Sequence, residues 1–230
     1  MRPLRVAIPV LALIFACSHD EGTHDPATTG SDAPVLQWPD PLPAHTEDVP
    51  HLRKGLVVGS WAPDEPGGFD HEWVDEAALR EVFTKEKAAR RSWHGFTAAD
   101  ATVPMDALMT DRTGPMIGYA YSLLARSSET GEFADEPAVM HVRHRGRVRI
   151  RFDGRVVVDE PASPDGDWRE VRVALTLTDA YDVVLAKVGR GNDELGASMN
   201  VQVRVSATDG SALPGQSWNS MRPPGLPTDL

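Results

Sequence analysis

The sequence predicts a mainly β protein folded as an antiparallel β-sandwich, and three observations carry that prediction. Residues 147–152 alternate strictly, with Val148, Ile150 and Phe152 on one face and arginines on the other. Asp153-Gly154, a dipeptide favoured in tight hairpins, then leads into a partner strand at 155–159. Short apolar segments separated by turns fill the rest of the chain without a strand–helix–strand rhythm, which is typical of a sandwich.

The remaining elements follow from periodicity. Within residues 168–178, alternate positions are apolar and face one way: Val171, Val173, Leu175 and Leu177. One helix is expected near residues 75–91, where an apolar stripe runs at helical spacing between early acids and late arginines. Further strands are expected at 56–61, 93–97, 117–125 (with Tyr119 and Tyr121 on one face), 138–144, 181–188 and 200–206.

The N-terminus reads as an export signal. Arg2 and Arg5 precede an apolar run from Val6 to Ala16, the order of a signal peptide over residues 1–16, and the run is too short for a membrane span of about 20 residues. The stretch Ile14-Phe15-Ala16-Cys17 resembles a bacterial lipobox, which implies that the only cysteine of the chain, Cys17, is lipidated. Ser18 after it resembles lipoproteins of the Gram-negative outer membrane. The alternative is an ordinary cleaved signal peptide with an incidental cysteine.

The remainder divides into three parts. Residues 17–54 are rich in proline and acids and are predicted to be a disordered tether, because they cannot bury enough apolar surface to fold. Residues 55–215 form the predicted sandwich, and 216–230 a polar tail. The formal charge is -11, from 23 basic and 34 acidic residues. This balance disfavours nucleic acid and anionic lipid surfaces as partners.

The order of several segments is similar to that of galactose-binding-like modules, which are jelly rolls related to PA14 domains and carbohydrate-binding modules. The segments are Leu56–Gly59, Gly118–Tyr121, the hairpin Phe152–Val157, Tyr181–Val188 and Val201–Gly210. The resemblance implies a jelly-roll fold and a carbohydrate ligand. Where many of these modules carry calcium-binding acids, this chain has Arg143-His144-Arg145-Gly146. Basic side chains supply no oxygen ligands, so no calcium site, other metal or cofactor is expected.

Arginines on one strand face are the first candidate ligand-binding residues. Arg147, Arg149 and Arg151 lie in the densest basic group of an acidic protein and suit a carboxylate or phosphate, for instance on an acidic glycan. The alternative is a solvated outer face whose arginines pair with acids such as Glu170 or Asp159.

Tryptophans are the second candidate. Trp73 and Trp168 lie near predicted turns and are candidates for exposed platforms that stack on a sugar ring, whereas Trp61 and Trp93 are expected in the core. The alternative is that Trp73 and Trp168 are single loop aromatics without a ligand.

No catalytic motif is recognisable: the sequence has no G-x-S-x-G, no H-E-x-x-H and no P-loop. We therefore expect a non-catalytic, lipid-anchored protein of the bacterial cell envelope, with the outer membrane favoured. Its expected partners are the membrane, through lipidated Cys17, and a glycan or an envelope protein, but not nucleic acid. The alternative function is a structural or protein-interaction lipoprotein with no small-molecule ligand.

Overall fold

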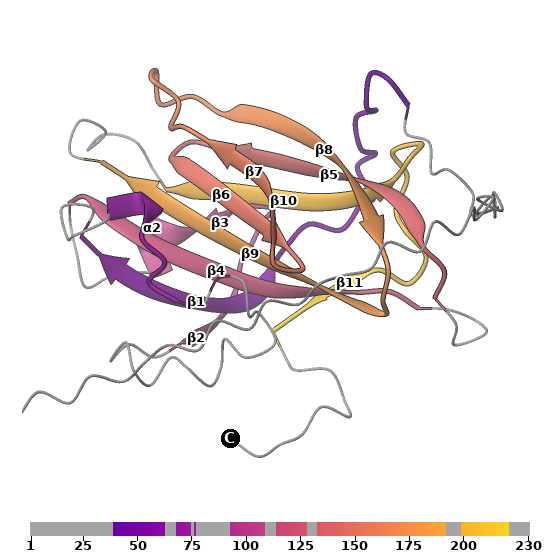
Figure 1. Ribbon diagram of the computed structural model, residues 1–230, viewed down its shortest axis with the longest axis horizontal. Helices are drawn as coiled ribbons and strands as arrows, with labels where there is room; N and C mark the ends of the chain where they lie inside the picture. Colours follow the sequence, from indigo (N-terminus) through magenta and orange to yellow (C-terminus); the bar gives the residue numbers. More distant parts are fainter. Residues whose placement is uncertain are drawn as a thin grey trace, which may run out of the picture. The chain divides into compact units, whose positions relative to one another are not determined.

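The computed structural model describes residues 39–62, 68–74, 76, 93–108, 114–127, 133–191 and 199–220. The predicted signal peptide, Cys17 and all but Glu76 of the helix predicted at 75–91 lie outside the described residues. Within them, two antiparallel sheets pack face to face, as the sequence predicted (Figure 1).

The larger sheet has the strand order β2-β1-β4-β9-β6-β7, and β11 extends it beside β4; the smaller sheet has the order β3-β10-β5-β8. In the larger sheet the strands are β1 (Lys54–Trp61), β2 (His94–Thr97), β4 (Met116–Ala125), β6 (Arg147–Phe152), β7 (Arg155–Glu160), β9 (Tyr181–Arg190) and β11 (Ser217–Asn219). In the smaller sheet they are β3 (Val103–Pro104), β5 (Glu136–His144), β8 (Arg169–Leu177) and β10 (Asn200–Ala207). Two short helices, η1 (Gly68–Asp70) and α2 (Met105–Leu108), complete the described elements.

The main core lies between the sheets and follows the predicted alternation. Val148, Ile150 and Phe152 of β6 point into it, as do alternate residues of β8 on the opposite sheet. The turn between β6 and β7 also matches its prediction. Asp153 and Gly154 have φ values of 45° and 83°, the left-handed conformations that a two-residue hairpin turn requires at both central positions.

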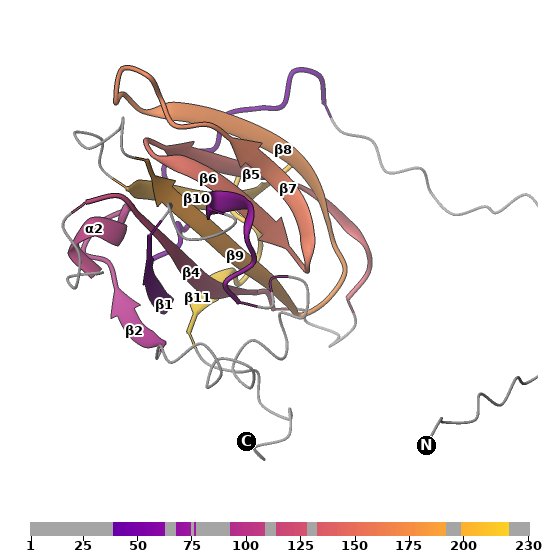
Figure 2. The ribbon, with the colours of Figure 1, turned by 60° about the vertical axis from the view of Figure 1, so that its left-hand side comes forward.

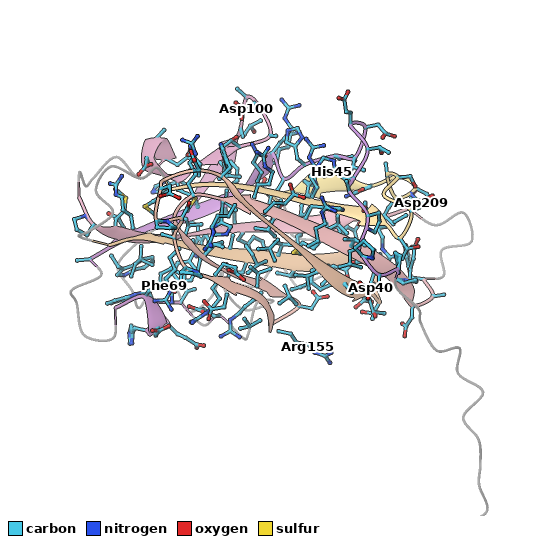
Figure 3. All side chains as sticks on the ribbon, turned by 90° about the horizontal axis from the view of Figure 1, so that it is seen from above. Asp40, His45, Phe69, Asp100, Arg155 and Asp209 are labelled. Atoms are coloured by element: carbon cyan, nitrogen blue, oxygen red, sulfur yellow. The ribbon has the colours of Figure 1, made fainter. Side chains whose placement is uncertain are left out.

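A second apolar cluster covers the outer face of the larger sheet. Tyr119 and Tyr121 share this face, as predicted, and both are buried beneath neighbouring side chains. Phe69 of η1 packs there, and the segment that includes η1 lies across strands β6 and β9 (Figure 2). His45 and Asp100 lie on one side of the strand layers, and Phe69 and Arg155 on the other (Figure 3). Part of the outer face of the larger sheet is therefore buried rather than exposed to solvent.

The N-terminal boundary of the folded region lies earlier than predicted. Val49 and Leu52 are each only 1% exposed. The Thr46 amide donates to the Gly210 carbonyl at 2.8 Å, and the Leu52 amide donates to the Val203 carbonyl at the same distance. The tether predicted to extend through residue 54 is therefore wrong at its C-terminal end, because isolated apolar residues within the proline-rich stretch dock on the sandwich.

The C-terminal boundary also moves. Residues Ser217–Asn219, predicted as the start of a polar tail, form β11 and pair with β4. Trp218 is 6% exposed, and its indole Nε1 donates to the Pro50 carbonyl at 3.1 Å. The burial of one large aromatic side chain thus adds the strand to the larger sheet and joins it to the N-terminal segment.

Candidate functional site

The three candidate arginines of β6 are all paired with carboxylates. Their partners come from the segment 70–76 and from β7. The ion pairs are Arg147–Asp70 (3.0 Å), Arg149–Asp70 (2.8 Å), Arg149–Asp159 (2.6 Å), Arg151–Glu72 (2.9 Å) and Arg151–Glu76 (3.1 Å). Asp159 is a partner that the alternative interpretation named, whereas Glu170 lies on the other sheet and pairs with Arg172.

The Arg149–Asp70 pair also affects the titration of its carboxyl group. The hydrogen bond from Arg149 holds the pKa of the Asp70 carboxyl below its usual value. The Arg147 guanidinium also lies 4.3 Å from the centroid of the Phe69 ring. An external anion would have to displace these internal carboxylates, so this row is poorly suited to bind one.

Beneath the arginines lies a buried ionic network centred on Glu76. Lys187 and Glu76 are both 1% exposed, and Lys187 Nζ donates to Glu76 Oε1 at 2.8 Å. The Tyr119 hydroxyl donates to the same oxygen at 2.7 Å, and Arg151 Nε contacts Oε2 at 3.1 Å. Burial lowers the pKa of Lys187 and raises that of Tyr119. The donors are directed at one carboxylate, which gives the network a structural role.

Trp73, one of the two predicted sugar platforms, belongs to the same packed layer. Its ring stacks on Trp61 with a centroid distance of 5.8 Å and an interplanar angle of 19°. The His71 ring meets the Trp73 ring edge-on, with a centroid distance of 4.4 Å. The Trp73 indole Nε1 donates to the Gly68 carbonyl at 3.3 Å. Trp61 is buried, as predicted, and Trp93 is half-buried against the same cluster. Trp73 therefore packs in the second apolar cluster, which covers the outer face of the larger sheet.

Trp168, the other predicted platform, lies immediately before β8 and is half-buried. The guanidinium carbons of Arg143 and Arg145 lie 5.3 and 5.1 Å from the centroid of its ring. We call these three residues the arginine–tryptophan corner. The basic run that contains Arg143 and Arg145 is visible in the sequence. Its placement beside Trp168 depends on the pairing of β5 with β8.

Arg143 differs from the arginines of β6 in its partners. Glu170 lies directly opposite it in the β5–β8 register, but the Glu170 carboxylate pairs with Arg172 at 2.8 Å. Arg143 itself makes one long contact, of 3.5 Å, to the Gln202 side-chain oxygen. Among the described residues, no carboxylate forms an ion pair with Arg143.

A cavity of about 370 Å³ opens where the edge strands β7 and β8 meet, and we call it the edge pocket. Its apolar lining comes from Phe152, Val157, Ala174 and Leu175. Its polar lining comes from Asp153, Arg155, Thr176 and Thr178. Sequence reasoning recognised the hairpin Phe152–Val157 but not this pocket, because the pocket forms only where that hairpin meets β8 of the opposite sheet.

A buried carboxyl pair adjoins the pocket. Asp182, which is fully buried, lies beside Asp153 of the pocket lining. Burial and the neighbouring charge of Asp153 raise the pKa of Asp182 to about 7, and Arg126, with its Nε 3.8 Å away, opposes the shift. Asp153 Oδ1 accepts a hydrogen bond of 2.7 Å from the Val183 amide. This bond holds the Asp153 carboxyl in place at the pocket.

Two buried histidines, His141 and His144, lie on β5, and their side chains face opposite sides of the sheet. His141 Nε2 lies 2.9 Å from the Ser206 hydroxyl, and His144 Nδ1 lies 2.8 Å from the Gly146 carbonyl. Burial lowers the pKa of His141 to about 4. Within the described ranges, no group of three or more histidines, cysteines or acids is arranged to hold a metal ion.

Comparisons with known proteins were made with both sequence and structure. No protein-family model matches the sequence, and no curated protein matches it either. Among solved structures, β-glucosidase from Kluyveromyces marxianus in complex with glucose aligns with a TM-score of 0.41 and 14% identity, over 68% of this chain and 16% of that one. The PA14 domain of the antifreeze protein MpAFP aligns with a TM-score of 0.37 and 12% identity, over 79% and 100% of the two chains.

A third structure, the PA14 sugar-binding domain from an RTX adhesin, aligns with a TM-score of 0.28 and 14% identity, over 67% of each chain. The chain therefore spans only about a sixth of the β-glucosidase, according to the 16% coverage. All three similarities are distant. The fold assignment accordingly rests on the strands and their pairing in the structure itself.

Proposed function

We propose that the sandwich is a non-catalytic carbohydrate-binding domain and that a sugar unit binds in the edge pocket. The pocket is the observation that carries this proposal. Its volume of about 370 Å³ lies in the range of small-molecule sites, which are concave and mostly apolar with a few convergent polar groups. No other function of the sandwich is needed to account for these features.

The polar groups of the pocket suit a sugar. Each sugar hydroxyl both donates and accepts hydrogen bonds. Asp153 supplies acceptors, Arg155 supplies donors, and the hydroxyls of Thr176 and Thr178 supply both. Phe152 and Leu175 offer apolar surface for the C–H faces of a ring. The sequence resemblance to galactose-binding-like modules supports the same class of ligand.

The carboxyl pair supports binding rather than hydrolysis. Glycosidases that use two carboxyl groups hold them about 5–5.5 Å apart when they retain configuration and about 6.5–9.5 Å apart when they invert it. Asp182 is fully buried, so its carboxyl group is not exposed to a ligand in the pocket. It therefore cannot flank a glycosidic bond together with Asp153.

The rival function, docking of another protein, has less support. Val156 of β7, at 47% exposure, is the one large apolar side chain that is exposed in the part of the chain that the structure describes. Protein interfaces usually present a contiguous apolar patch, and a single valine does not make one.

The location of the protein at the bacterial cell envelope, with the outer membrane favoured, is also part of the proposal. It rests on the sequence of residues 1–18, with lipidation at Cys17. Among the described residues, no helix is long and apolar enough to cross a membrane. In cells fed a palmitate analogue, we expect the wild-type protein to be labelled and Cys17→Ala not to be. Labelling retained by Cys17→Ala would overturn the assignment.

Binding is tested with the full chain carrying Cys17→Ser, screened on a glycan array and followed by calorimetry. We expect Arg155→Ala and Thr176→Val each to weaken binding of the best glycan about tenfold, since each removes a hydrogen bond from an enclosed site. Arg147→Ala, which changes the same charge on the far face of the larger sheet, is the matched control. Undiminished binding by both pocket variants, or no binding to any glycan, would refute the proposal.

A further inference from the structure

In the arginine–tryptophan corner, Arg143 differs from the arginines of β6 because no ion pair to it is formed by the described part of the chain. Every arginine of β6 reaches a carboxylate at 3.1 Å or less. Arg143 has none among the described residues, although Glu170 is its cross-strand neighbour. The chain has a net charge of -11, so acidic residues outnumber basic ones. A shortage of acidic residues therefore does not explain why Arg143 differs from the arginines of β6.

Geometry favours binding of an anion at this position. The guanidinium carbons of both Arg143 and Arg145 lie within 5.3 Å of the Trp168 ring centroid. Contact with an aromatic ring restrains a guanidinium, which reduces the entropy lost when it binds a ligand. Its N–H edges can then grip a carboxylate or sulfate with two parallel hydrogen bonds.

We infer that the arginine–tryptophan corner is a second binding site, which takes the carboxylate or sulfate groups of an anionic polysaccharide. The site is separate from the edge pocket. Trp168 lies just before β8 and Thr176 near its end, so about 27 Å of extended strand separates them at the usual rise of a β-strand. One sugar ring cannot reach both sites, and the inference does not depend on the pocket.

Charge also selects among polymers. Asp165 and Asp167 are exposed in the turn before Trp168, and the whole chain is acidic. Such surroundings repel a polymer with a phosphate at every unit, because nucleic-acid affinity depends on neutralising several phosphates at once. A polysaccharide that has an anionic group on only a minority of its sugar units carries these groups farther apart, and one group can enter the corner without bringing many others close to those acids.

The experiment compares a sparsely substituted dextran sulfate, in which only a minority of the glucose units carry a sulfate, with uncharged dextran. It uses the full chain with Cys17→Ser at low salt, and calorimetry is the readout. We expect the wild-type sequence to bind dextran sulfate and not dextran, with an affinity that falls as salt is added. Arg143→Ser combined with Arg145→Ser should weaken the binding at least tenfold. Arg147→Ser combined with Arg149→Ser removes the same charge from the paired row and is the matched control, expected to change the affinity less than twofold.

Three outcomes would overturn the inference. They are no binding of dextran sulfate by the wild-type sequence, equal losses in the two double variants, and binding of oligo-dT as tight as that of dextran sulfate. Trp168→Leu gives a second check, because it removes the ring while leaving both charges, and we expect a loss of about threefold to tenfold. Arg155→Ala reports on the edge pocket alone and should leave dextran sulfate binding unchanged, so failure of one site is distinguishable from failure of the other.

Discussion

The outer faces of the two sheets carry similar arginines but use them differently. On the larger sheet, Arg147, Arg149 and Arg151 are closed off by acids that the segment 70–76 and β7 bring to them. On the smaller sheet, Arg143 contacts an indole ring and no carboxylate of the described chain. The comparison teaches that a run of arginines in a sequence indicates an anion-binding site only after the carboxylates that pair with it inside the protein have been identified.

Burial explains why the two faces diverge. The face of the larger sheet is an interior, in which Lys187 and Glu76 are each 1% exposed, and buried charges persist only when they are paired. On the smaller sheet Arg143 is half-buried, so part of its side chain is in contact with water. A charge left unpaired at the surface costs little stability and remains available to a ligand.

The largest expected effect is at the buried pair. Lys187→Met should lower the free energy of unfolding by about 3–5 kcal/mol, because it leaves the buried Glu76 carboxylate without its closest cation. Urea denaturation measures the loss. Lys187→Met combined with Glu76→Gln should recover at least half of it, since no uncompensated charge then remains. A double variant no more stable than the single one would show that the pair is not the source of the stability.

The next effect concerns pH on the smaller sheet. Burial, reinforced by the nearby positive charges of Arg172 and Arg204, lowers the pKa of His141 to about 4, from an ordinary value of 6.5. At a pH between these two pKa values, the histidine is protonated in the unfolded chain and neutral in the folded chain. The contribution of His141 to stability is therefore complete above about pH 6.5 and falls as the pH drops toward 4, by about 3 kcal/mol at most.

His141→Gln tests this dependence, because glutamine keeps a hydrogen-bonding group near Ser206 but has no charge to gain. Thermal unfolding across pH 4 to 7 should show a flatter stability profile for the variant than for the wild type. An identical slope in both proteins would mean that His141 does not control the acid sensitivity of this face.

A smaller effect separates the two classes of arginine directly. Arg151→Met should cost about 1.5–3 kcal/mol, the usual contribution of hydrogen bonds to charged groups, because its partner Glu76 is buried. Arg143→Met should cost about 0.5 kcal/mol or less, as for most surface substitutions. Chemical denaturation of both variants under one set of conditions measures the two losses in the free energy of unfolding. Equal losses would show that Arg143 and Arg151 do not differ in their contribution to stability.

The smallest effect is expected at the rim of the covered face. Arg147 and its partner Asp70 have side chains that are 36% and 67% exposed. Exposed pairs of this kind contribute between about 0 and 1 kcal/mol. Arg147→Ser should therefore leave the unfolding midpoint almost unchanged, and adding salt should reduce the difference further. A loss near that of Lys187→Met would place Arg147 within the buried network.

Local features of the fold were predictable, and long-range ones were not. The β6–β7 hairpin follows from strict alternation and an Asp-Gly turn, both contained within a few residues. Asp159 lies only 10 positions from Arg149 and was among the expected partners. The acids of the segment 70–76 lie 75 to 79 positions from their arginine partners, and nothing near Arg149 signals Asp70. Lys187 lies in an apolar strand, and its contacts with the Glu76 carboxylate and the His71 carbonyl explain how a lysine can be buried there.

The candidate site shows the same limit. Trp168 was identified as a candidate from its place near a turn, but its arginine neighbours depend on the register of β5 against β8. Trp73 carried the same signal and proved to be stacked on Trp61. The edge pocket has no sequence signal, because two sheets must first meet to create it. Val49 and Leu52 were overlooked because single apolar residues among prolines have no period.

The docking of residues 39–53 has a mechanical consequence. A pull on the chain from its N-terminal side reaches the contacts of this segment before it reaches either sheet. The first of them are the Arg172–Leu42 and Thr46–Gly210 hydrogen bonds, ahead of the buried Val49. Releasing residues 39–48 would lengthen the chain by about 35 Å at full extension. The N-terminal segment should therefore detach under force while the strands of both sheets stay paired. A single-molecule pulling trace should record this detachment as a short extension step before the domain unfolds.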